Sequence, residues 1–296
     1  MKILITGSNG FLGAYLSKFS ADRNMQVVCT AKKRADFQYP LFEYLDITDP
    51  VRLKYLLDLH QPDVLINTAA ISKPDPCQKN KPDCYAVNYM AVKTIADVCY
   101  QKGVHLIHMS SDFVYDGRRG LYSEEDIPEN PVNYYGHCKL EAEKHIVSSP
   151  VKSAIVRTCL VYGYPLMPQA SNLFTWVKSS LEKGNSIQVV NDQFRTPTLV
   201  ADLADAVLKL ASKKAEGIWH ISGDEYLSVY EFACRIASAF DLPLSRMQPV
   251  ASATLNQVAM RPPKTGFRIN KAICEINYHP HNISQGLDVL HEHTNP

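Results

Sequence analysis

The chain has 296 residues, of which 46% are hydrophobic and 21% are charged, an ordinary composition for a globular protein. Its 31 lysine and arginine residues nearly balance its 30 aspartate and glutamate residues, so no overall charge favours binding to nucleic acid or to a membrane surface. The amino terminus does not resemble a signal peptide, and no apolar run reaches the roughly 18 residues that a membrane helix needs.

The cysteines and histidines give no sign of a metal site. The eight cysteines include no Cys-x-x-Cys pair and no zinc spacing, and most lie in apolar segments, where cysteine behaves as a small hydrophobic residue. Two histidine pairs near the carboxyl end, His279 with His281 and His291 with His293, lack companion ligands. We therefore predict a reduced, cytoplasmic protein without a metal, and a solvated tail at these histidines.

Apolar strands alternate with helices through the first 160 residues. In chain order, we expect strands at 2–6, 26–31, 41–45, 63–67, 104–109 and 154–159, and helices at 10–23, 50–59, 83–102 and 133–147. Strands that are apolar throughout are typical of parallel sheets covered on both faces. The alternation therefore predicts a doubly wound α/β fold of the Rossmann type.

The pattern changes after residue 160, where prolines become frequent. A helix at 200–212 and a strand at 217–221 are expected to return to the first domain. We therefore assign residues 1–160 plus about 198–222 to a dinucleotide-binding Rossmann domain. Residues about 161–197 plus 223–296 form a smaller, mixed α/β substrate lobe, which we expect to cover the carboxyl ends of the parallel strands, where ligands bind in such folds.

A glycine-rich turn connects the first strand to the first helix. Glycines at this point permit a tight turn and let the backbone approach a pyrophosphate, while the start of the helix offers free N–H groups. The position of the turn favours dinucleotide binding over an ordinary turn. The residues concerned are Gly7, Asn9, Gly10, Phe11, Leu12 and Gly13.

The end of the second strand indicates which dinucleotide is preferred. An acidic residue there would bind the ribose 2′-hydroxyl of NAD, but the strand is followed by Lys32, Lys33 and Arg34, with no acid before Asp36. Cations suit the 2′-phosphate of NADPH. We therefore expect NADPH to be preferred, while use of NADH, or a merely solvated basic loop, stays open.

Ser111, Tyr135 and Lys139 form the candidate catalytic group. Tyr135 and Lys139 are four residues apart at the start of an expected helix and so share one face, and Ser111 ends the preceding strand. A hydroxyl, a phenol and an ammonium together can exchange a proton at a carbonyl or alcohol carbon. Tyr89 and Lys93 have the same spacing, but they lie in the middle of a helix and are interpreted as packing and surface residues.

With these elements the chain resembles an extended short-chain dehydrogenase/reductase, and more narrowly the dTDP-4-dehydrorhamnose reductase family. The resemblance runs through nearly the whole chain. Its segments are the glycine turn, 46–48, 67–70, 110–117, 122–126, 131–143, 157–163, 192–198 and 261–264.

The resemblance implies roles for particular residues. Ser111, Tyr135 and Lys139 match the catalytic positions, while Asp112, Phe113, Arg195 and Arg261 match the substrate side. The cofactor side is implied to comprise Gly7, Asn9, Gly10, Phe11, Leu12, Gly13, Lys32, Lys33, Asp46, Ile47, Ala69 and Ala70, together with Tyr135 and Lys139.

Two departures from the family pattern concern the substrate. Phe113 stands where the family usually has a tyrosine, which removes one hydroxyl from the sugar pocket. Arg195 stands where many reductases have a glycine, and in relatives with an arginine there it contacts the pyrophosphate of a sugar nucleotide.

The resemblance implies NAD(P)H-dependent reduction of the 4-keto group of a nucleotide-linked 6-deoxysugar. We hypothesise that Lys139 lowers the pKa of Tyr135, which protonates the oxygen, and that Ser111 binds the carbonyl. Two alternatives stay open: an epimerase or dehydratase with tightly held NAD, and a regulatory subunit like that of methionine adenosyltransferase. The expected partner is a nucleotide sugar, and a homodimer is left open.

Overall fold

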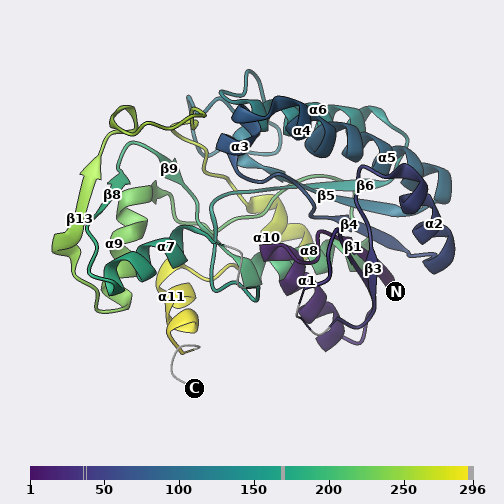
Figure 1. Cartoon of the computed structure of the whole chain (residues 1–296), viewed down its shortest axis with the longest axis horizontal. Helices are drawn as coiled ribbons and strands as arrows, with labels where there is room; N and C mark the ends of the chain where they lie inside the picture. The colour runs from purple at the N-terminus through teal and green to yellow at the C-terminus, as the bar shows by residue number, and fades with distance from the viewer. Residues whose placement is uncertain (36, 38, 168–170, 293–296) are drawn as a thin grey trace.

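A seven-stranded parallel sheet forms the centre of the larger part of the molecule (Figure 1). The computed structural model of the protein describes residues 1–35, 37, 39–167 and 171–292. The strand order is β11-β6-β5-β4-β1-β2-β3. The bounds are β1 Lys2–Thr6, β2 Gln26–Ala31, β3 Phe42–Tyr44, β4 Val64–Asn67, β5 His105–Ser111, β6 Ser153–Thr158 and β11 Gly217–His220.

Helices cover both faces of this sheet, which confirms the predicted doubly wound α/β fold. One face packs against α1 (Phe11–Asp22), α8 (Val200–Lys213) and α10 (Asn270–Ile276). The other packs against α2 (Pro50–His60), α5 (Ala91–Lys102) and α6 (Tyr134–Ser148). Helices on both faces bury the apolar side chains of the strands, as expected for a parallel sheet with apolar strand sequences.

The strand order indicates where on the sheet a ligand would bind. The chain runs outward from β1 through β2 to β3, and then reverses from β4 on the other side of β1. Thr6 and Asn67, the last residues of β1 and β4, are paired in register and their side chains are hydrogen bonded at 2.6 Å. A parallel sheet opens a crevice at such a reversal point, beyond the carboxyl ends of the strands.

The remaining elements lie beside this edge and have an apolar core of their own (Figure 1). They comprise α7 (Leu173–Glu182), α9 (Val229–Ala239) and α11 (Ile283–Glu292), and three short strand pairs. The pairs are β7 (Val161–Tyr162) with β10 (Thr198–Leu199), β8 (Ile187–Val190) with β13 (Met247–Val250), and β9 (Phe194–Arg195) with β12 (Leu227–Ser228).

The helix expected at 83–102 is wrong in detail. The structure has α4 (Lys81–Tyr85), a π-helical turn over Ala86–Met90 and then α5, with α3 (Pro74–Lys79) preceding them. The turn contains the buried Asn88, whose side chain bonds both the N–H and the carbonyl of Ile71. This long-range contact is not visible in a hydrophobic period, so the interruption was missed.

The carboxyl-terminal segment also differs from the expected solvated tail. Ile283, Leu287 and Leu290 of α11 are buried in the core of the smaller part, and His281 pairs with the buried Asp202. His293 lies outside the described residues. In the ranges that the structure describes, no group of three or more His, Cys, Asp or Glu side chains is arranged to hold a metal ion. No helix within those ranges combines the length and apolarity needed to cross a membrane.

Candidate active site

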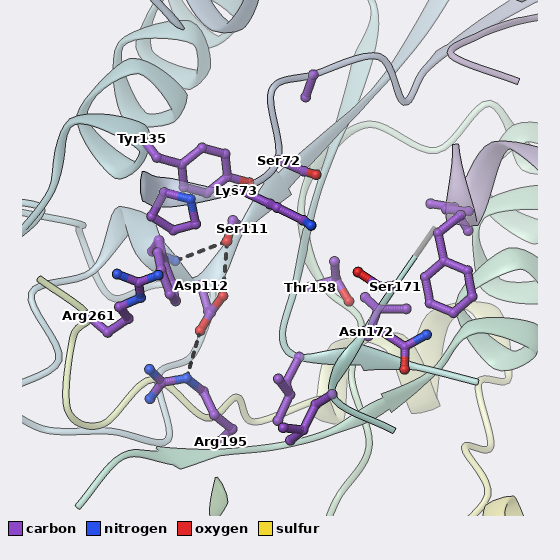
Figure 2. A pocket seen from close by; sticks show the side chains of 18 of the residues that line it. Ser72, Lys73, Ser111, Asp112, Tyr135, Thr158, Ser171, Asn172, Arg195 and Arg261 are labelled. Carbon is purple, nitrogen blue, oxygen red and sulfur yellow. Dashed lines mark hydrogen bonds and ion pairs between the residues drawn. The ribbon is translucent and has the colours of Figure 1, made fainter. Parts of the chain in front are cut away.

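A cavity of about 800 Å³ lies at the carboxyl edge of the sheet, between the larger and smaller parts (Figure 2). Its walls come from segments far apart in the sequence. Residues expected for catalysis, cofactor and substrate line it together: Asn9, Gly10, Phe11, Leu12, Gly13, Ala70, Ser111, Asp112, Phe113, Tyr135, Lys139, Arg195 and Arg261.

Ser111 is the last residue of β5 and faces this cavity. Its hydroxyl accepts a hydrogen bond from the Phe113 N–H at 3.2 Å and donates one to Asp112 Oδ1 at 2.9 Å. These two bonds, drawn in Figure 2, fix the orientation of the hydroxyl. The hydroxyl has one proton, so it can donate to a substrate carbonyl oxygen only by turning away from Asp112.

Tyr135 is brought beside Ser111 by the start of α6. Asn133 caps this helix by accepting a hydrogen bond from the Gly136 N–H at 2.9 Å. Gly136 approaches the strand end so closely that an added Cβ would lie 2.1 Å from the Phe113 carbonyl oxygen. The Tyr135 ring packs edge-on against Phe113, with 6.0 Å between the ring centres.

The acid–base properties of Tyr135 and Lys139 differ from the sequence expectation. Burial raises the pKa of the Tyr135 phenol above its ordinary value, and a hydrogen bond with Ser111 acts against this rise. Burial also lowers the pKa of Lys139 from 10.5 to about 8, although the negative charge of Glu143 acts against the fall. Lys139 is therefore not found to lower the pKa of Tyr135, because the phenolate loses its hydration in this enclosed position.

Lys139 makes a direct contact with the neighbouring strand. Its Nζ atom donates to the Met109 carbonyl oxygen at 2.8 Å, and the side chain is buried. This bond ties the ammonium to β5, the strand that ends at Ser111. Tyr135 and Lys139 were expected on one face of a helix, and both indeed line the cavity from α6.

The start of α1 fits the phosphates of a dinucleotide. Gly10 caps the helix without a side-chain bond, and no acidic residue lies in its first turn. The backbone N–H groups at this end therefore have no acceptor within the helix and can bind a phosphate group. Gly7 has a positive φ of 70°, and a Cβ there would lie 2.8 Å from the backbone of Ala69, so only glycine permits this close turn.

A second cavity of about 570 Å³ continues from the glycine turn along the other side of β1. Gly7, Lys32, Ile47, Ala69 and Ala70, all expected on the cofactor side, line it. Its position beyond the glycine turn fits the adenosine end of a dinucleotide.

Two further residues expected on the cofactor side, Lys33 and Asp46, do not line either cavity. The Lys32 ammonium pairs with Asp46 at 2.9 Å, and the Lys33 carbonyl accepts a bond from Asn9 at 2.6 Å. Lys32 is therefore the basic residue of the expected cluster that lines the second cavity. Asp36 lies outside the described residues.

Arg195 does not offer a free guanidinium to a pyrophosphate. Its side chain is only 4% exposed, and its Nε lies 3.5 Å from Asp112 Oδ2. The other two guanidinium nitrogens donate to the carbonyls of Phe194, Pro262 and Pro263 and to the side chain of Gln193. Every guanidinium nitrogen therefore has a protein partner, although Arg195 lines the cavity; its expected contact with substrate phosphate stays a prediction.

Asp112 is the carboxylate that Arg195 holds. It is buried and accepts hydrogen bonds from Ser111, Thr265 and Cys159. Burial raises the pKa of Asp112, although the Arg195 charge and these donors act to lower it. Asp112 thereby links Ser111 to the loop of the smaller part that carries Thr265.

Arg261 also lines the cavity, and Figure 2 shows it on the same side as Asp112. Its guanidinium donates to Asp75 Oδ1 at 2.5 Å, and the neighbouring Ala259 N–H bonds the same carboxylate at 3.0 Å. These contacts tie the loop after Met260 to the start of α3. Arg261 keeps 17% of its side chain exposed and still borders the cavity.

Several cavity residues were missed by the sequence reasoning. Thr158 ends β6, so the rule that parallel strand ends gather at one edge could have found it. Ser72, Lys73, Asn172 and others come from irregular segments that no motif marks. Neither Tyr89 nor Lys93, the second Tyr-x-x-x-Lys pair, lines either cavity.

The parallel sheet, the glycine turn and the shared cavity of Ser111, Tyr135 and Lys139 define a protein of the extended short-chain dehydrogenase/reductase class. The sequence model of the family described as "RmlD substrate binding domain" matches residues 1–294. The chain therefore belongs to this family.

Individual relatives have different described roles. Methionine adenosyltransferase 2 subunit beta of Bos taurus is 33% identical over 257 residues, which are 85% of this chain and 76% of that protein. The spore coat polysaccharide biosynthesis protein SpsK of Bacillus subtilis is 29% identical over 288 residues, 97% of this chain and 95% of that protein. The solved dTDP-4-dehydrorhamnose reductase of Bacillus anthracis, in complex with NADP, superposes with a TM-score of 0.89 at 27% identity over 99% of both chains.

Proposed function

We propose that the protein is an NAD(P)H-dependent reductase of the 4-keto group of a nucleotide-linked 6-deoxysugar. The observation that carries this proposal is that Ser111, Tyr135 and Lys139 line one cavity with the glycine turn, residues 10–13. A carbonyl held at Ser111 is then within the same space as a hydride carrier on that turn.

The protonation states suit reduction. The nicotinamide supplies a hydride to the carbonyl carbon when the cofactor is bound. Ser111 holds the carbonyl oxygen by a hydrogen bond, and Tyr135 gives its phenolic proton to that oxygen. A proton donor must be protonated before the reaction, and the raised pKa keeps the Tyr135 phenol neutral at physiological pH. Lys139, largely an ammonium at pH 7, would hold the nicotinamide ribose through N–H groups that its bond to Met109 leaves free.

The cofactor is expected to lie across β1. The start of α1, from Gly10 to Gly13, would bind the pyrophosphate, and Ile47, Ala69 and Ala70 would border the adenosine. Lys32 supports a preference for NADPH, because its ammonium borders this side and suits a 2′-phosphate. The NADP complex of the reductase from Bacillus anthracis supports the same cofactor.

The smaller part would hold the nucleotide end of the substrate. We assign residues about 161–197 plus 223–296 to this lobe and 1–160 plus about 198–222 to the Rossmann domain. Trp176, Gln188, Gln193 and Gln257 of the lobe line the cavity and offer a ring face and amide groups to a base or ribose. Asp112, Phe113 and Arg261 complete the substrate side.

An activity screen tests the proposal. Purified protein is incubated with NADPH or NADH and with dTDP-, UDP- or GDP-linked 4-keto-6-deoxysugars, and oxidation of the cofactor is followed by absorbance. We expect turnover with one of these substrates and NADPH. Purified protein that carries stoichiometric NAD, or that turns over none of them, would contradict the proposal.

A second function is favoured by the relation to methionine adenosyltransferase 2 subunit beta, at 33% identity. On this alternative the cavity binds a dinucleotide for regulation. Tight NADPH binding without turnover, together with co-purification with a methionine adenosyltransferase catalytic subunit, would support it. The retention of Ser111, Tyr135 and Lys139 at one cavity favours the reductase.

A further inference from the structure

The cavity has an excess of basic side chains. Of the described residues that line it, one is acidic, Asp112, and four are basic: Lys73, Lys139, Arg195 and Arg261. Such a lining suits an anionic ligand. The question is which of the four cations is available to bind it.

Three of the four are already engaged. Lys139 donates to a backbone carbonyl and is buried. Arg195 has a partner at each guanidinium nitrogen, among them the carboxylate of Asp112. Arg261 forms an ion pair with Asp75. Only Arg195 has a protein partner at every guanidinium nitrogen; Lys139 and Arg261 keep N–H groups without a hydrogen-bond partner in the described ranges, but Lys139 is buried and the charge of Arg261 is paired with Asp75.

Lys73 differs from these three. It is exposed, and none of the acidic side chains in the described ranges lies at ion-pair distance from its ammonium. Asp75, two residues further along the chain, is occupied by Arg261 and by the Ala259 N–H. Among the described residues that line the cavity, Lys73 is therefore the exposed cation without an ion-pair partner, whereas Lys139, which also has no carboxylate at ion-pair distance, is buried.

The backbone of Lys73 is nevertheless held in place. Asn88 bonds both the N–H and the carbonyl of Ile71, two residues before it, at 2.9 and 3.0 Å. Pro74 follows and restricts Lys73 to extended conformations, as observed at φ −97° and ψ 127°. A fixed backbone that presents a free ammonium lowers the entropy cost of binding an anion there.

Figure 2 shows where this ammonium points. The Lys73 side chain passes Tyr135 and Ser111 and extends into the cavity toward the wall of Thr158 and Asn172. The reacting sugar is expected at Tyr135 and Ser111, and the nucleoside in the smaller lobe. The ammonium thus lies between the two, where the group that joins sugar to nucleoside would pass.

We propose that Lys73 binds the diphosphate of the sugar-nucleotide substrate and is a specificity-determining residue for it. The inference rests on the proposed function and deepens it. A neutral keto-deoxysugar joined to a nucleoside diphosphate carries its charge on the diphosphate alone, so a single free cation at this point selects for that group. Lys73, rather than Arg195, is then the direct phosphate ligand.

Binding measurements on Lys73→Ala test this inference. The dissociation constants of dTDP, dTMP and NADPH are measured by calorimetry for the wild type, Lys73→Ala, Lys73→Arg and the control Lys79→Ala. Lys79 is an exposed lysine at the end of the same short helix and does not line the cavity.

We expect Lys73→Ala to weaken dTDP binding about 10- to 100-fold, the loss of a charge-assisted hydrogen bond. Binding of NADPH should stay unchanged, and Lys73→Arg should retain most of the dTDP affinity. With a turned-over substrate, KM should rise while kcat changes little, since the contact is present in both ground and transition states.

Two results would contradict the inference about Lys73 without contradicting the proposed function. If Lys73→Ala binds dTDP as tightly as the wild type and Lys79→Ala do, Lys73 does not contact the diphosphate. Weakened NADPH binding with unchanged dTDP binding assigns Lys73 to the cofactor instead. If the wild type binds no nucleoside diphosphate and reduces no sugar nucleotide, the proposed function fails, and the inference fails with it.

Discussion

Gly136 and Phe113 touch where α6 meets the end of β5, and an added Cβ on Gly136 would lie 2.1 Å from the Phe113 carbonyl oxygen. This approach brings Tyr135, the residue before Gly136, to the same cavity as Ser111, two residues before Phe113. The relative position of the two groups expected to act on the carbonyl therefore depends on a residue without a side chain.

Replacing Gly136 by alanine should displace the start of α6. We expect the free energy of unfolding to fall by about 1–3 kcal/mol, the usual cost of overpacking, and kcat to fall more than KM changes, because the displacement moves Tyr135. Urea unfolding and steady-state kinetics measure the two effects. Gly103→Ala is the control, since it adds backbone strain at φ 65° with no atom within 4 Å of the new Cβ. A fully active Gly136→Ala protein would contradict the assigned geometry.

Replacing Tyr135 by phenylalanine removes the proposed proton donor. Turnover should fall about 100-fold or more, the range of general acid catalysis, while the dissociation constant of NADPH stays nearly unchanged. Stopped-flow absorbance and fluorescence titration measure these quantities. Tyr89→Phe, in the second Tyr-x-x-x-Lys pair, should leave turnover intact, because Tyr89 does not line the cavity. Undiminished turnover in Tyr135→Phe would refute the assignment.

The lowered pKa of Lys139 should make the stability of the protein depend on pH. Its pKa is lowered from 10.5 to about 8 in the folded protein. Between these values the unfolded chain binds more protons, so stability should rise as pH increases from about 8 to 10.5. The rise is roughly 3 kcal/mol for a shift of this size, and Lys139→Met should lack it.

Urea unfolding of both proteins at pH 7 and pH 10.5 measures this difference. Lys144→Met, an exposed lysine on the same helix, should keep the wild-type pH dependence. The same free energy difference between wild type and Lys139→Met at both pH values would mean that the Lys139 pKa is not lowered.

Substitutions of Arg195 and Asp112 should have non-additive effects on the free energy of unfolding. Arg195→Met should destabilise the protein by about 3–5 kcal/mol, because it leaves Asp112 buried without its cation. In the double variant with Asp112→Asn the loss should be smaller than the sum of the single losses by about 1–3 kcal/mol. A double-mutant cycle on unfolding free energies measures this coupling. Additive losses would mean that Arg195 acts mainly through its bonds to backbone carbonyls.

Lys32 and Lys33 should differ in their effect on cofactor choice. Lys32 lines the second cavity and Lys33 does not. Lys32→Ala should raise the KM for NADPH about 10-fold, the cost of a charge-assisted hydrogen bond, and leave the KM for NADH nearly unchanged. Lys33→Ala is the matched control. If both variants change the KM for NADPH and the KM for NADH by the same factor, the basic cluster does not bind the 2′-phosphate.

Local sequence patterns were sufficient for much of the fold. Apolar strands and helical periods predicted β1 and α6 to within a residue or two, because main-chain geometry and side-chain period are local properties. The same patterns missed the π-helical turn that contains Asn88, a residue that bonds Ile71 seventeen residues away. They also missed α11, whose buried face depends on partners in the smaller core.

Spacing along single elements is enough to predict the parallel sheet, its glycine turn and the helix face that Tyr135 and Lys139 share. Which cavity cations are paired within the protein depends instead on tertiary contacts. Arg195 is held by Asp112 and by carbonyls near residue 262, and Arg261 is held by Asp75. These contacts join positions 67 to 186 residues apart, and no local pattern records them. Among the described residues that line the cavity, Lys73 is left as the exposed cation without an ion-pair partner for that reason.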